Sequence, residues 1–194
     1  MLNRIIQSIL KLLVSENDIS EEDINIYYFG LECIILKLVH YVSYIIIGVI
    51  MDDVISLLIS ACVFMPLRSF AGGYHAKTRL GCYMFSCMMV VCMCLTNRVT
   101  MYNGVYVMAL IIYNIIITVF SPIESSSNIL DDKEKIIQKY KTFAILGFFN
   151  ILIIITMYKN VTIYRYLVNG IGLVAFLLLL GTYTKIYKTR NSVE

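Results

Sequence analysis

The sequence predicts an all-α, polytopic integral membrane protein of about six transmembrane helices, and three observations support this class. First, 59% of the 194 residues are hydrophobic and the mean hydropathy is +0.79, which is more apolar surface than one soluble core can bury. Second, only two prolines interrupt long runs rich in Ile, Leu, Val, Met and Tyr. Third, these runs lack the polar and apolar alternation of barrel strands, so each span must satisfy its backbone within a helix.

Six segments have the length and apolarity of spans, which need about 17 to 25 residues. They cover residues 31–51, 54–64, 80–96, 101–120, 143–158 and 163–182. The second is short for a full crossing and is expected to end at Pro66, unless it continues through Leu67. A chain of 22.2 kDa leaves no room for a separate soluble domain, so a single domain is expected over residues 1–194.

The positive charges predict the orientation, because loops rich in lysine and arginine resist translocation. If the N-terminus is cytoplasmic, six spans place twelve of these residues inside and three outside. The inside residues are Arg4, Lys11, Arg68, Lys77, Arg79, Lys133, Lys135, Lys139, Lys141, Lys185, Lys188 and Arg190, and the outside residues are Arg98, Lys159 and Arg165. Both termini and the segment 66–82 are therefore expected to face the cytoplasm.

Residues 1–30 are expected to form an interfacial, cytoplasmic N-terminal segment. Leu2, Ile5 and Ile9 recur at helical spacing opposite polar residues, a pattern typical of an amphipathic helix that lies on a membrane. Ser20, followed by Asp23, has the pattern of a helix N-cap, so a second helix is expected to begin there. The acidic residues around it either cap this helix or form a docking patch for a partner.

The polar segment after the fourth span ends in the lysines at positions 133, 135, 139 and 141. These lysines either serve as ordinary topological charges or form a surface that attracts anionic lipid or an acidic peptide. His40 leaves two alternatives open as well, because it lies inside the first span near Lys37. A structural hydrogen bond is the favoured role for His40, and catalysis is the alternative.

No cofactor, metal site or nucleic-acid partner is expected. Five of the six cysteines lie within the expected spans, where thiols act as small apolar packing groups: Cys33, Cys62, Cys87, Cys92 and Cys94. The pair Cys92 and Cys94 lacks the spacing of a zinc or redox site. The pair Gly72 and Gly73 matches neither glycine pattern that binds phosphate.

The segment 66–82 holds the groups best suited to chemistry. A neutral His75 can take the proton of Cys82, and a thiolate attacks a carbonyl far better than a thiol does. One continuous helix would separate the two residues by about 10.5 Å along its axis, which is too far for proton transfer. The glycine pair and a Thr78 N-cap instead favour a loop that folds back toward Cys82. The alternative is a loop beside the membrane with an incidental histidine.

The start of the third span adds to this chemistry. Lys77 and Arg79 are cations beside Cys82, and free backbone N–H groups at a helix start also favour a thiolate. The N–H groups of Gly81 and Cys82 are candidate oxyanion donors. Arg68 has a planar guanidinium suited to anchoring the loop or to pairing with a substrate carboxylate.

The motif Arg68-x-x-x-Gly72-Gly73-Tyr74-His75-Ala76 followed by Cys82 resembles the accessory gene regulator B family, membrane peptidases of bacterial quorum sensing. The resemblance implies that His75 and Cys82 are the catalytic dyad. It also implies a homodimer in the bacterial cell membrane whose partner is a precursor signalling peptide (AgrD-like). The family typically has a loop with proline and asparagine after the fourth span, and Pro122 and Asn128 match this loop only loosely.

The implied activity is that of a cysteine endopeptidase. Such an enzyme removes the C-terminal tail of the precursor through a thioester and promotes cyclisation to a thiolactone or lactone. Substrate-binding or loop-anchoring roles are then expected in the catalytic loop and helix start, for Arg68, Gly72, Gly73, Lys77 and Arg79. The rival interpretation is a non-catalytic small membrane transporter or scaffold whose basic loop only fixes topology.

Overall fold

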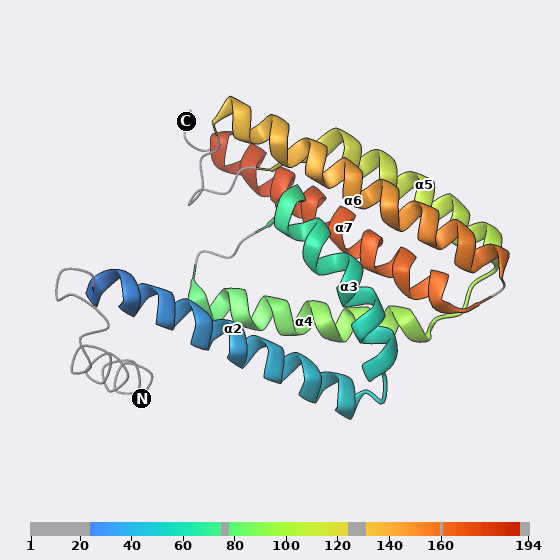
Figure 1. Ribbon diagram of the computed structural model, residues 1–194, viewed down its shortest axis with the longest axis horizontal. Coiled ribbons are helices and arrows are strands. Elements are labelled where there is room, and N and C mark those ends of the chain that lie inside the picture. The colour runs from blue at the N-terminus through green and yellow to red at the C-terminus, as the bar shows by residue number, and fades with distance from the viewer. Residues whose placement is uncertain (1–23, 75–77, 124–130, 160, 191–194) are drawn as a thin grey trace. The chain divides into compact units, whose positions relative to one another are not determined.

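The computed structural model describes residues 24–74, 78–123, 131–159 and 161–190. Its elements are six helices: α2 (Ile24–Ile50), α3 (Val54–Ala71), α4 (Arg79–Arg98), α5 (Asn103–Phe120), α6 (Asp132–Tyr158) and α7 (Ile163–Arg190) (Figure 1). Each contains an apolar stretch long enough to cross a membrane, and the described residues contain no β-strand. The expected all-α class and the six spans are confirmed, and the protein is a multi-pass membrane protein.

The chain divides into two compact units, Met1–Ile46 and Ile47–Glu194. The described part of the first unit consists of most of α2. In it, the Nδ1 atom of His40 lies 2.7 Å from the Leu36 carbonyl oxygen, one turn earlier on the same helix. This contact is the structural hydrogen bond favoured for His40, whereas the neighbouring Lys37 side chain is exposed.

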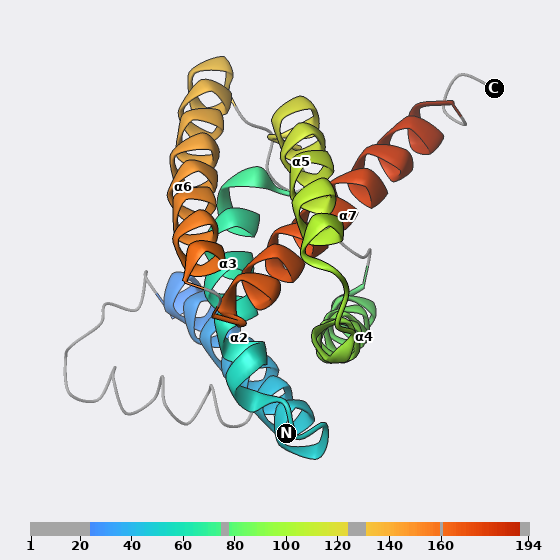
Figure 2. The same ribbon diagram turned by 90° about the vertical axis from the view of Figure 1, so that its right-hand side faces the viewer.

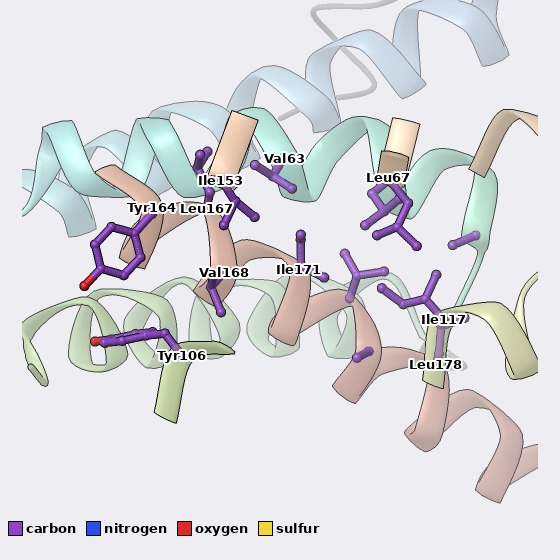
Figure 3. Close-up of a cluster of buried hydrophobic side chains, with 14 residues drawn as sticks. Val63, Leu67, Tyr106, Ile117, Ile153, Tyr164, Leu167, Val168, Ile171 and Leu178 are labelled. Atoms are coloured by element: carbon purple, nitrogen blue, oxygen red, sulfur yellow. The ribbon is translucent and has the colours of Figure 1, made fainter. Parts of the chain in front are cut away.

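Helix α7 is the centre of the second unit. It contacts α3, α4, α5 and α6, and Figure 2 shows it running past α3 and α5. Half of the residues in its apolar stretch are buried inside the protein, a larger share than in any other of the six spans. Its fully buried residues Ile171, Val174 and Leu178 form the middle of the core, where Val63 and Leu67 of α3 meet them (Figure 3). In a bilayer, close packing of this kind holds helices together because lipid is as apolar as the core.

Two glycines of α7 let neighbouring helices approach its backbone. A Cβ atom at Gly170 would lie 2.6 Å from the carbonyl oxygen of Ser60 on α3. A Cβ atom at Gly172 would lie 2.6 Å from the ring of Tyr113 on α5. Small residues at such positions are the usual means of close helix packing in membranes. These glycines therefore serve contacts within one chain.

A polar cluster joins α3, α4 and α7 near the start of α3. Asn97 donates to Ser60 Oγ at 3.2 Å and to Asp53 Oδ2 at 3.4 Å, and its carbonyl oxygen accepts from Asn169 at 3.0 Å. Ser60 also donates to the Tyr166 carbonyl oxygen at 3.0 Å. Polar side chains that satisfy one another in this way add to helix association in lipid.

The expected end of the second span was wrong, because α3 continues through Pro66 to Ala71. Proline removes one N–H donor, which membrane helices tolerate when neighbours and side chains compensate. Here the last turn is held by Leu67 and Ala71, which are both fully buried. As a result Arg68 lies on a helix and not in a loop.

The expected fifth span, residues 143–158, lies within α6, but the helix itself begins earlier, at Asp132. Asp131 and Glu134 form a capping box that starts the helix before the apolar run. The four lysines therefore lie on a helix, and Lys141 Nζ lies 5.2 Å from the centre of the Phe70 ring. Helix α7 likewise extends to Arg190, past the expected end at residue 182. The predictions for residues 1–23, including the Ser20 cap, fall outside the described residues.

Candidate active site

The candidate site begins where α3 ends, and two glycines make the turn. Gly72 has a backbone φ of 77° and Gly73 has a φ of 134°. Residues that carry a Cβ atom rarely adopt these backbone conformations. A Cβ at Gly72 would collide with the carbonyl oxygen of Ile123. A Cβ at Gly73 would lie 2.9 Å from the Arg68 Nη1 atom. The turn predicted from the glycine pair is therefore present at the end of α3, and it needs glycine at both positions.

Three hydrogen bonds fix the first residues of this loop. The Ile123 N–H donates to the Ala71 carbonyl oxygen at 3.0 Å, which pairs the segment after α5 with the end of α3. The Tyr74 N–H donates to the Leu177 carbonyl oxygen of α7 at 3.2 Å. Arg68 Nη2 donates to the Tyr74 carbonyl oxygen at 2.8 Å. Both polar backbone atoms of Tyr74 are thus held by other parts of the fold.

The Tyr74 side chain extends the same anchoring to α4. Its ring meets the Phe85 ring edge-on, with the ring centres 5.0 Å apart and the planes at 63°. Phe85 follows Cys82 by three residues on α4, and residues three apart lie on one side of a helix. The residue that precedes His75 is therefore fixed against the side of α4 that carries Cys82.

Cys82 lies in the first turn of α4 and is half-buried. The predicted N-cap is present, because Thr78 Oγ1 accepts from the Gly81 N–H at 3.1 Å. The Cys82 N–H donates to the Thr78 carbonyl oxygen at 2.9 Å. Both N–H groups that the sequence suggested as oxyanion donors therefore already bind Thr78.

The other candidate residues are placed as follows. Residues 75–77, which include His75 and Lys77, lie outside the described residues. Arg79 is the first residue of α4. The structure brings Arg68, Gly72 and Gly73 together around Tyr74.

Sequence reasoning missed four residues that position this loop. Phe85 contacts the Tyr74 ring, and Leu177, Gly181 and Ile123 contact the loop backbone. A glycine inside α7 was the one available signal, since glycine in a helix often marks a close backbone approach. Its partner was not readable, because the loop and α7 are far apart in the sequence.

The structure also bears on metal binding. Among the residues that it describes, no three His, Cys, Asp or Glu side chains lie close enough to hold a metal ion. The five other cysteines lie on helices α2, α3 and α4.

The family model described as Accessory gene regulator B matches residues 3–178, which is most of the chain and includes all of the candidate site. No curated protein and no solved structure matches the chain.

Proposed function

Because the chain belongs to the accessory gene regulator B family and so has a role in that quorum-sensing system, we propose that it is a membrane-embedded cysteine endopeptidase. Its substrate is a precursor signalling peptide. The enzyme removes the C-terminal tail of this peptide and promotes cyclisation of the remainder to a thiolactone or lactone. Cys82 is the nucleophile and His75 is its base.

The position of Tyr74 carries this proposal. Consecutive Cα atoms are 3.8 Å apart, so His75 starts within that distance of a residue fixed at both its N–H and its carbonyl. The Tyr74 ring contacts Phe85, one turn from Cys82 on the same side of α4. An incidental loop would not need such anchoring at the residue before its only histidine.

The proposed reaction begins when His75 takes the proton of the Cys82 thiol. The thiolate attacks the carbonyl carbon at the tail junction, and the carbon–nitrogen bond breaks as His75 returns the proton to the leaving amine. The tail departs as a free amine, and an acyl thioester remains on Cys82.

Ring closure follows by exchange at the thioester. A cysteine thiol or serine hydroxyl of the bound peptide attacks the same carbonyl carbon, with His75 taking its proton. The bond to Cys82 breaks, and His75 reprotonates the released sulfur. A thioester already holds the energy of the new bond when the product is a thiolactone, so no ATP is required. Water must be excluded, because hydrolysis would give a linear acid.

The basic residues have supporting roles in this proposal. Arg68 anchors the loop through the Tyr74 carbonyl oxygen. Lys77 and Arg79 add positive charge at the inner membrane face, where an acidic tail would be attracted. We further propose that the catalytic loop and both termini are cytoplasmic. The chain forms a single membrane peptidase domain, and two chains form a homodimer.

Substitution tests the proposal. Proteoliposomes would receive a synthetic peptide with an amphipathic leader, an internal cysteine and an acidic tail, and tail release would be followed by mass spectrometry. Cys82→Ala and His75→Ala are expected to abolish release, whereas the controls Cys62→Ala and His40→Ala retain it. Equal release by the Cys82→Ala protein would refute the peptidase and favour a transporter or scaffold.

A further inference from the structure

Helix α7 supplies the surface on which the candidate loop rests. The Tyr74 N–H donates to the Leu177 carbonyl oxygen at 3.2 Å. Gly181 lies one turn further along α7, where an added Cβ would be 3.0 Å from Tyr74 N and 3.1 Å from the Gly73 carbonyl carbon. The loop backbone therefore crosses α7 at Leu177 and Gly181, and the missing side chain of Gly181 makes room for it.

Three features show how closely the loop fits against α7 at this crossing. The atoms that approach Gly181 belong to the loop backbone, which cannot rotate away as a flexible side chain can. Gly73 and Gly181 are both buried, so other parts of the protein surround the contact. Ile123 also reaches it, since its Cδ1 atom would lie 3.3 Å from a Cβ at Gly181.

We propose that Gly181 is a positioning residue for the proposed catalytic dyad. Although it lies 99 positions after Cys82 in the sequence, it sets the distance between α7 and the backbone of Tyr74. Tyr74 in turn is the residue before His75 and the contact of Phe85 on α4. In this proposal Gly181 acts on His75 through the backbone of Gly73 and Tyr74, which it contacts. This inference rests on the proposed function.

The expected effect of Gly181→Ala follows from distance. Contacts of 3.0 to 3.1 Å are shorter than ordinary van der Waals contacts, so the loop must move away from α7 by a few tenths of an ångström or more. A misplacement on the order of 1 Å at a catalytic group can cost about 10²-fold in rate. A smaller displacement is expected to cost about tenfold in kcat.

The test uses a small reagent and needs no peptide substrate. Full-length protein in liposomes would be labelled with iodoacetamide from pH 5 to 9, and the labelling rate of Cys82 would be measured by mass spectrometry. Loss of the base in His75→Ala is expected to move the rate profile to higher pH. Gly181→Ala is expected to move it in the same direction and to slow labelling at pH 7 about tenfold. The double variant is expected to match His75→Ala alone.

Two matched alanine variants separate positioning from stability. Gly147→Ala on α6 meets no neighbouring atom within 4 Å and is expected to label like the unsubstituted protein. Gly170 lies on α7, as Gly181 does, but away from the loop. Gly170→Ala crowds the Ser60 carbonyl oxygen of α3, so it is expected to lower the melting temperature without moving the profile. A profile that moves equally in Gly170→Ala would overturn the positioning role.

The outcomes also separate the two proposals. If His75→Ala leaves the profile unchanged, the dyad itself fails. If His75→Ala moves the profile but Gly181→Ala does not, the dyad stands and the role of Gly181 is refuted. Should Gly181→Ala fail to insert, hydrogen exchange of the Tyr74 amide in the unsubstituted protein decides the matter. Slow exchange supports its bond to Leu177, and exchange at the rate of an open loop contradicts it.

Discussion

The contact between Tyr74 and Phe85 gives a quantitative prediction. Phe85→Leu keeps an apolar side chain on α4 but removes the edge-to-face pair, whose ring centres lie 5.0 Å apart. Such pairs contribute about 0.5 to 1.5 kcal/mol beyond their buried area. If that free energy holds the loop against α4, the equilibrium constant for docking the loop falls by about 2- to 13-fold. The rate of tail release is expected to fall by up to the same factor.

The assay for this prediction is a double-mutant cycle. Tail release would be measured at saturating peptide for Phe85→Leu, Tyr74→Leu and the double variant, with Phe148→Leu as a control on the exposed side of α6. If the two rings act as one contact, the double variant loses no more than the larger single loss. Additive losses, or a Phe85→Leu protein with the full rate, would refute the coupling between loop and helix.

Three further predictions concern the fold and the turn. Leu67→Ala, at a fully buried position beyond Pro66, is expected to destabilise the protein by about 2 to 5 kcal/mol, while exposed Ile55→Ala changes little, as a thermal melt in detergent would show. Asn97→Ala removes the centre of the polar cluster and is expected to cost about 1 to 3 kcal/mol in the same melt; an unchanged melting temperature would contradict this. Gly72→Ala is expected to abolish tail release with helix content retained by circular dichroism, whereas Gly104→Ala, which meets open space, keeps full activity.

The membrane class and the six spans could be predicted because hydropathy integrates over many residues. The errors concern the residues at which individual helices begin and end. Pro66 was treated as a helix end, but a buried last turn at Leu67 and Ala71 outweighs one missing donor. The helical residues 132–142 before the fifth span were not expected, because their charges lower the hydropathy of that stretch. The capping pattern of Asp131 and Glu134 was nevertheless present in the sequence.

The candidate site divides in the same way. The Thr78 cap and the glycine turn are local features, and their roles follow from the residues themselves. The loop also contacts Leu177 and Gly181, which lie far away in the sequence. The spacing of residues along the chain does not predict such a contact. The sequence suggested Gly81 and Cys82 as oxyanion donors, and in this structure both N–H groups donate to Thr78.

The most direct test of the account is to isolate the acyl-enzyme. The protein would be mixed with the precursor peptide, quenched in acid and digested, and the fragment that contains Cys82 would be weighed by mass spectrometry. The account predicts a fragment heavier by the mass of the tail-less peptide, with the added mass removed by hydroxylamine. Tail release without any adduct on Cys82, or with an adduct on another residue, would contradict it.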